Sequence, residues 1–300
     1  MMEYYSNGKL FILGEYYVLE GAKAFALPTK FGQSLSVFPT QSVALSWKSY
    51  DADGSVWYND ELLISDILSN NQTSGNKIRR TLISILYHAN LMNPTILKNG
   101  FEVETRLTFP RNWGLGTSST LINNIAQWFD VDAFKLLQQS FGGSGYDIAC
   151  AQNDAPITYQ LKNNQPVVEQ VKFNPSFKKH IYFVYLNQKR DSKEAIANFR
   201  NKQKDLTQSI NEISEMTDKL LQINDLEVFV DFFTQYEQKL SEILETPTIQ
   251  QQLFPDFNGL VKSLGGWGGD FVMVASQENP VNYFKQKGFK TILSYEDMIL

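Results

Sequence analysis

Cysteine and histidine are scarce in this sequence. Cys150 is the only cysteine of the 300 residues, which excludes an intrachain disulfide and a thiolate metal cluster. His88 and His180 are the only histidines, and each lies beside an apolar run. A metal site with several imidazoles or a Ser-His-Asp hydrolase would have to depend on one of these two. We expect both histidines to be half-buried structural residues, and Cys150 to be buried and inert.

Long apolar runs and an excess of positive charge are also absent. No stretch approaches the roughly 18 uninterrupted apolar residues of a membrane-spanning helix, and the N-terminus lacks the apolar segment of a signal peptide. The net charge is -5, whereas nucleic acids and anionic membranes require a basic surface. We therefore expect a cytoplasmic protein, a monomer or homodimer, with no nucleic-acid or membrane partner.

The first part of the chain has strand patterns and one clear helix. A hairpin is expected at Asp53-Gly54, a favoured turn dipeptide. The apolar positions within 78–89 fall on one helical face. Residues 101–109 alternate between apolar and polar, which predicts a strand with one buried face that ends at Pro110.

The second part of the chain combines long helices with short strands. Two amphipathic helices are expected over 196–220 and 226–244. Further elements are expected as strands at 165–173, 180–186, 271–275 and 290–295 and as a helix at 279–288. Strands mixed with segregated helices predict an α+β architecture. A polar stretch near residue 170 predicts two domains, 1–170 and 171–300.

A glycine-rich turn stands directly before an apolar helix at residues 113–129, WGLGTSSTLINNIAQWF. The first turn of a helix leaves backbone N–H groups unpaired, and glycines let a ligand approach them closely. Gly114, Gly116, Thr117 and Ser118 thus form a candidate phosphate-binding loop, whose hydroxyl groups can also bind Mg²⁺. The loop is neither a Walker A nor a G-x-G-x-x-G motif. The alternative is that Ser118 or Ser119 caps the helix and the glycines merely turn the chain.

Three motifs in a fixed order resemble those of the GHMP kinases, the family of galacto-, homoserine, mevalonate and phosphomevalonate kinases. The second family motif, P-x-x-x-G-L-G-S-S, is similar to residues 110–118, with threonine at the first hydroxyl position. The first motif resembles residues 8–16, and the third, glycine-rich motif resembles residues 265–270. The segment 143–149, GSGYDIA, and Lys262 look closer to phosphomevalonate kinase than to mevalonate kinase.

This resemblance implies a two-lobed α+β fold, with a ribosomal-S5-domain-2-like N-terminal lobe and a ferredoxin-like C-terminal lobe. It implies ATP and Mg²⁺ as cofactors, with Ser118 as a metal ligand and Asp147 and Lys9 as catalytic residues. The residues expected around the ATP phosphates are Gly114, Leu115, Gly116, Thr117, Ser118 and Ser119. Those expected around the acceptor are Glu15, Gly145, Tyr146, Gly266, Trp267, Gly268 and Asp270. Glu15 is expected to support the site rather than to perform chemistry.

The chain departs from the family pattern in three places. The segment from Ser118 to Asp147 is roughly half as long as in mevalonate kinases. Leu136 stands where those enzymes have a metal-binding glutamate, and Trp267 stands where the family has glycine. Magnesium would then be held by Ser118, phosphate oxygens and water. These changes bear on the acceptor more than on the nucleotide.

The resemblance predicts ATP-dependent phosphoryl transfer to a small hydroxylated or phosphorylated metabolite of the mevalonate pathway, with phosphomevalonate ahead of mevalonate. A sugar or homoserine acceptor is the alternative within the family. A catalytically silent relative that binds nucleotide as a sensor or scaffold is the alternative from another class. A pure interaction module would bind no ATP.

Overall fold

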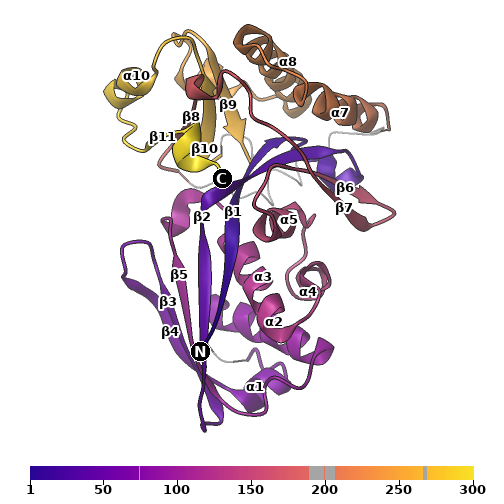
Figure 1. The fold of residues 1–300 in the computed structure, drawn as a ribbon, viewed down its shortest axis with the longest axis vertical. Helices are drawn as coiled ribbons and strands as arrows, with labels where there is room; N and C mark the ends of the chain where they lie inside the picture. The colour runs from indigo at the N-terminus through magenta and orange to yellow at the C-terminus, as the bar shows by residue number, and fades with distance from the viewer. Residues whose placement is uncertain (74, 189–198, 200–206, 266–268) are drawn as a thin grey trace. The chain divides into compact units, whose positions relative to one another are not determined.

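A computed structural model describes residues 1–73, 75–188, 199, 207–265 and 269–300. These residues form two sheets (Figure 1). One is seven-stranded with the order β4-β3-β5-β2-β6-β7 and with β1 paired to β2; the other is four-stranded with the order β11-β8-β10-β9. The mixed α+β architecture agrees with the prediction. The chain divides into two compact units, and the domain boundary expected near residue 170 stays a prediction.

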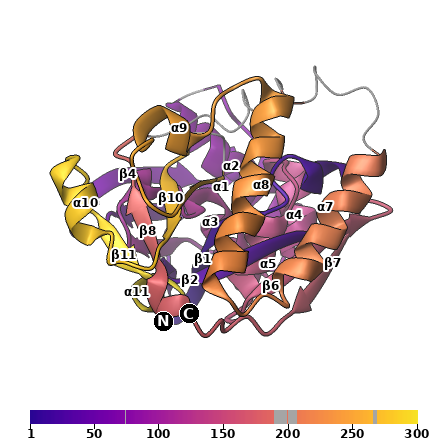
Figure 2. The ribbon, with the colours of Figure 1, turned by 90° about the horizontal axis from the view of Figure 1, so that it is seen from above.

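Unit 1 comprises residues 1–9, 31–111 and 115–153. Its strands are β1 (Met2–Leu13) and β2 (Ala24–Pro39), which both continue into unit 2, β3 (Ala44–Tyr50), β4 (Val56–Leu63) and β5 (Phe101–Leu107). Its helices are α1 (Ile64–Leu68), α2 (Lys77–Met92), α3 (Thr117–Phe129), α4 (Ala133–Ser140) and α5 (Tyr146–Gln152). Figures 1 and 2 show these helices on one face of the sheet.

The core of unit 1 lies between the sheet and these helices. Val103 of β5 pairs with Val37 of β2 and packs into the core, whereas Glu102 is exposed, so the alternation predicted for this strand is confirmed. The helix predicted at 78–89 is α2, whose apolar face is buried in the same core. The predicted hairpin joins β3 to β4, and Gly54 adopts φ 81° in its turn.

Unit 2 comprises residues 10–30, 112–114 and 154–300. Its remaining strands are β6 (Ile157–Lys162), β7 (Gln165–Gln170), β8 (Ile181–Tyr185), β9 (Leu260–Leu264), β10 (Phe271–Ala275) and β11 (Ile292–Ser294). Its helices are α7 (Thr207–Leu220), α8 (Leu226–Leu244), α9 (Ile249–Leu253), α10 (Val281–Gln286) and α11 (Tyr295–Met298). Short 3₁₀ turns occur at η1 (Tyr17–Glu20), η2 (Arg111–Trp113) and η3 (Lys178–His180).

The helix predicted at 226–244 is α8, and the second part of the helix predicted at 196–220 is α7. Ile196 and Leu206, which supported the first part of that prediction, lie outside the described residues. β9 was not expected from the sequence; it pairs antiparallel with β10 and is buried along its whole length.

His88 and His180 are both half-buried, as expected, and His180 Nδ1 lies 3.0 Å from the Ser276 carbonyl oxygen. Within the described part of the chain, no helix is both long and apolar enough to cross a membrane.

Candidate active site

Two charged side chains of unit 1, Lys9 and Asp147, meet in an ion pair. Lys9 lies in β1 and Asp147 in the first turn of α5, and Lys9 Nζ is 3.4 Å from Asp147 Oδ1. The two side chains are 13% and 25% exposed, so the pair is largely buried but still reaches solvent. Gly145 is the N-cap residue of α5 and has φ 92°, a conformation that glycine adopts readily. The structure therefore brings the two predicted catalytic residues together.

The surroundings of this ion pair keep Lys9 protonated. Burial lowers the pKa of Lys9, but Tyr146 and Asp147 raise it by more, and the net shift is upward. Lys9 Nζ also lies 5.5 Å from the centre of the Tyr146 ring, at cation–π distance. Burial raises the pKa of Tyr146, with a further contribution from the charge of Asp147, so the phenol is neutral near pH 7. The site thus holds a fixed positive charge beside a carboxylate.

Cys150 lies one helical turn after Asp147 and is fully buried, which confirms the expected burial. Burial raises the pKa of its thiol, and the negative charge of Asp147 raises it further. A thiol that remains protonated is a poor nucleophile. The chemistry of the site therefore rests on the ion pair.

The glycine-rich loop starts helix α3 without a side-chain cap. Gly116 is the N-cap residue, with φ 95°, and no side chain caps the N-terminus of the helix by a hydrogen bond. The alternative in which Ser118 or Ser119 caps the helix is therefore wrong. No described residue accepts a hydrogen bond from the N–H groups of residues 117–119. Such groups, at the positive end of a helix, are suited to bind phosphate oxygens.

Gly116 also lies against the ion pair. A β-carbon at Gly116 would be 3.5 Å from Lys9 Cγ and 3.9 Å from Asp147 Oδ1. In addition, the Lys9 N–H donates a 3.0 Å hydrogen bond to the Leu115 carbonyl oxygen. The ion pair and the first turn of α3 therefore form one continuous group within unit 1.

The other residues predicted for the site lie in unit 2 or outside the described residues. Gly114 and Asp270 contact each other in unit 2, where a β-carbon at Gly114 would be 2.6 Å from Asp270 Cγ. Residues 266–268, which include the three predicted residues Gly266, Trp267 and Gly268, lie outside the described residues.

For magnesium, the described residues contain no group of three or more histidine, cysteine, aspartate and glutamate side chains that could hold a metal ion. Leu136, which the resemblance matched to a metal-binding glutamate of mevalonate kinases, is fully buried in the core of unit 1. Ser118 is exposed at the first turn of α3. A metal ion would therefore depend on this hydroxyl, on phosphate oxygens and on water.

Glu15 belongs to a buried cluster in unit 2 that consists of Glu15, Tyr236, Glu237 and Lys262. Glu15 Oε1 accepts a 2.6 Å hydrogen bond from Lys262 Nζ, and Glu15 Oε2 accepts one of 2.6 Å from the Tyr236 hydroxyl group. Tyr236 in turn accepts a hydrogen bond from the Gly14 N–H. Both carboxylate oxygens of Glu15 are thus engaged within the protein, and this geometry favours a supporting role over direct contact with a substrate.

Glu237 was not identified from the sequence as a buried charged residue, although its position on α8 indicates burial. It follows Phe233 by four residues and precedes Leu240 by three, so it lies on the apolar face of the helix. A carboxylate at such a position requires a partner, and Glu237 Oε1 lies 3.5 Å from Lys262 Nζ. Burial raises the pKa of Glu237 to about 7, although the charge of Lys262 opposes this shift.

We expect Glu237 to make the protein less stable as the pH rises. Its pKa is about 7 in the folded protein against an ordinary value of 4.5, so the folded state holds the proton more tightly than the unfolded state. The contribution is fully present below about pH 4.5 and is lost as the pH rises through 7, a loss of roughly 3 kcal/mol at most. Urea unfolding at pH 5 and pH 8 measures it.

The variant Glu237→Gln should abolish this part of the pH dependence. Glu242→Gln, at an exposed position of the same helix, is the matched control and should behave as the wild type. If the free energy of unfolding falls by the same amount from pH 5 to pH 8 in the wild type and in Glu237→Gln, the expectation is contradicted.

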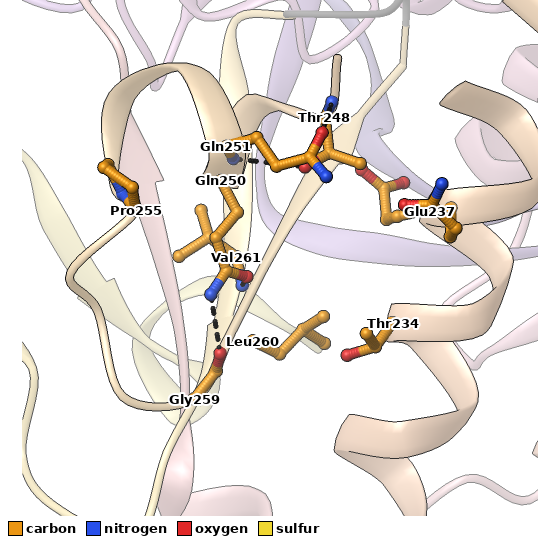
Figure 3. Close-up of a pocket in the computed structure, with 10 residues that line it drawn as sticks. Thr234, Glu237, Thr248, Gln250, Gln251, Pro255, Gly259, Leu260 and Val261 are labelled. Atoms are coloured by element: carbon orange, nitrogen blue, oxygen red, sulfur yellow. Dashed lines mark hydrogen bonds between the residues drawn. The ribbon is translucent and has the colours of Figure 1, made fainter. Parts of the chain in front are cut away.

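A pocket of about 320 Å³ lies beside this cluster in unit 2, between α8, α9 and β9 (Figure 3). Glu237 lines it from α8, and Gln250 and Gln251 line it from α9. The Gln250 amide donates to the Gly259 carbonyl oxygen, and the Gln251 side chain accepts from the Thr248 N–H. The side-chain amides of Gln250 and Gln251 therefore hold α9 in place. The pocket is lined by residues of unit 2, whereas Lys9 and Asp147 belong to unit 1.

Comparison with known proteins shows the fold. No family model matches the chain, and no curated protein matches its sequence. Among solved structures, a mevalonate kinase is 16% identical, with a TM-score of 0.74 and 100% of both chains covered. The Streptococcus pneumoniae phosphomevalonate kinase in complex with phosphomevalonate and AMPPNP is 16% identical, with a TM-score of 0.73, covering 98% of this chain and 100% of that one. The Lactococcus lactis galactokinase complexed with galactose is 13% identical, with a TM-score of 0.68, covering 95% and 88%.

The chain therefore has the GHMP kinase fold, as its motifs predicted. At identities of 13–16%, these similarities establish the arrangement of the elements and leave the reaction to be argued from the residues.

Proposed function

We propose that this protein is an ATP-dependent kinase that phosphorylates a small hydroxylated or phosphorylated metabolite. The observation that carries the proposal is the ion pair between Lys9 and Asp147, which lies against Gly116 at the uncapped start of α3. An anion-binding helix terminus next to a carboxylate and an ammonium group is suited to phosphoryl transfer, which depends mainly on positioning and on charge stabilisation. The phosphomevalonate kinase complex with AMPPNP, which shares the fold, supports ATP as the donor.

The nucleotide phosphates would bind at the loop from Gly114 to Ser119. The N–H groups of residues 117–119 fit this role because no described residue accepts their hydrogen bonds. Ser118 would be the protein's ligand to magnesium. When bound, the metal ion would neutralise negative charge on the phosphates.

In the transfer step, an acceptor oxygen forms a bond to the γ-phosphorus. The bond from that phosphorus to the bridging oxygen breaks, and its electron pair leaves with ADP. With a hydroxyl acceptor, Asp147 takes or orients the proton, and Lys9 offsets the negative charge on the transferred group. With a phosphate acceptor no proton has to move, and Asp147 then acts by holding Lys9. Gly145 and Tyr146 are proposed to contact the acceptor.

We propose a mevalonate-pathway acceptor, with phosphomevalonate first and mevalonate second. ADP release should be measured with mevalonate, phosphomevalonate, homoserine and galactose, each with magnesium and ATP. Turnover with mevalonate or phosphomevalonate supports the proposal. Turnover with homoserine or galactose would show that the acceptor is homoserine or a sugar and would contradict a mevalonate-pathway acceptor. AMPPNP binding without turnover on any acceptor would overturn the kinase proposal in favour of a nucleotide sensor or scaffold.

A further inference from the structure

Residues 112–114, which lead from η2 into the glycine-rich loop and include its first glycine, are packed on the four-stranded sheet of unit 2. The hydroxyl group of Tyr185, the last residue of β8, donates a 3.1 Å hydrogen bond to the Asn112 carbonyl oxygen. The Trp113 ring packs edge-on against Phe271 of β10, with 5.4 Å between ring centres, and lies 6.2 Å from the Tyr185 ring. A loop segment is thus bound to two neighbouring strands.

Gly114 continues this contact. Its φ is 67°, and a β-carbon there would overlap the Asp270 carboxylate, at 2.6 Å from Cγ. The position therefore requires glycine both for the backbone conformation and for the space that Asp270 occupies. The Asp270 side chain lies on the main chain of the loop at this point.

The pairing of β8 with β10 explains why these groups lie together. Phe271 stands opposite Tyr185 in the antiparallel register, and the Leu186 N–H donates a 2.9 Å hydrogen bond to the Asp270 carbonyl oxygen. Burial raises the pKa of Tyr185, and the nearby charge of Asp270 raises it further, so the hydroxyl group remains a donor. The sheet therefore presents a hydroxyl, a ring and a carboxylate to residues 112, 113 and 114 in turn.

We propose that Tyr185, Phe271 and Asp270 form a latch that fixes the start of the glycine-rich loop for nucleotide binding. Asp270 is then a positioning residue for the nucleotide rather than an acceptor-binding residue. The inference rests on the proposed function, because it assigns the loop to the nucleotide. A loop with two glycines at positive φ loses much backbone entropy when it becomes ordered, and a latch that orders it beforehand reduces the loss on binding.

The variant Tyr185→Phe tests the latch because it removes one hydroxyl group and keeps the ring. Tyr182→Phe, on the same strand, is the matched control. Amide hydrogen exchange should become faster at residues 112–116 in Tyr185→Phe only. The dissociation constant for AMPPNP with magnesium, measured by calorimetry, should rise about fivefold, as expected for the loss of one hydrogen bond. Unchanged exchange at residues 112–116 would overturn the proposal.

The contact between Gly114 and Asp270 is tested by a double-mutant cycle. Gly114→Ala should weaken AMPPNP binding by at least about tenfold, since the new methyl group meets the carboxylate. Asp270→Ala combined with Gly114→Ala should recover part of this loss, whereas additive effects of the two substitutions would contradict the contact. A raised KM for the acceptor in Asp270→Ala, with unchanged AMPPNP affinity, would also overturn the assignment.

Failure of the proposed function gives a different result. If the wild type binds no AMPPNP, the kinase proposal fails. The exchange comparison between Tyr185→Phe and Tyr182→Phe then still decides whether the latch exists.

Discussion

Replacing Asp147 with asparagine should lower kcat about 100- to 10,000-fold with a hydroxyl acceptor, the range expected for loss of a general base. Asparagine keeps the size of the side chain but removes the charge that faces Lys9 Nζ at 3.4 Å and the site that receives a proton. The affinity for AMPPNP should stay within about twofold of the wild type. The measurement is ADP release at saturating substrate, together with calorimetric titration of AMPPNP.

The matched control for this variant is Asp130→Asn, at an exposed position directly after α3. Asparagine suits its positive φ of 53° as well as aspartate does. The control should retain wild-type turnover. If Asp147→Asn keeps more than about a tenth of the wild-type kcat with a hydroxyl acceptor, Asp147 is not the base, because a general base contributes at least about 100-fold.

The type of acceptor changes the size of this effect. A phosphate acceptor is already ionised near pH 7 and has no proton to give up, so Asp147→Asn would then remove only the carboxylate that holds Lys9. We expect a smaller loss of kcat in that case. The ratio of the losses with mevalonate and phosphomevalonate thus separates proton transfer from positioning by Asp147.

Replacing Lys262 with methionine should destabilise the protein by about 3–5 kcal/mol, the range for breaking a buried ion pair by removing one partner. The Lys262 side chain is 0% exposed and lies between two carboxylates, at 2.6 Å from Glu15 Oε1 and 3.5 Å from Glu237 Oε1. Methionine fills the space but leaves both carboxyl groups buried without a cation. Urea unfolding at pH 7 gives the change in the free energy of unfolding.

Lys239→Met is the control for this loss. Lys239 pairs with Glu212 at a partly exposed position, where an ion pair contributes about 1 kcal/mol or less. If Lys262→Met does not fold, the double variant Lys262→Met with Glu237→Gln should recover part of the stability, because one buried carboxylate is then neutral. If Lys262→Met unfolds at the same urea concentration as the wild type, Lys262 does not stabilise the protein through a buried ion pair.

Local sequence patterns predicted much of the fold. The alternation along β5 and the three- and four-residue spacing in α2 and α8 appear in the structure as buried faces, because each pattern repeats with the period of its own element. The sequence also predicted part of the candidate site. Lys9 stood in the first of the three family-like motifs and Asp147 in the segment 143–149, and the structure places Lys9 Nζ 3.4 Å from Asp147 Oδ1. Their roles in the reaction remain proposals.

The sequence by itself determined where β5, α2 and α8 form and which glycines precede α3, since these depend on neighbours along the chain. The tertiary structure alone decided that Glu15 meets Lys262 and Tyr236, and that Asp270 occupies the space beside Gly114. These partners are far apart in the sequence, and their contacts depend on strand register and helix packing. The periodic pattern of apolar residues predicts neither strand register nor helix packing. It assigns a residue to one face of its strand or helix but does not say which residue lies opposite.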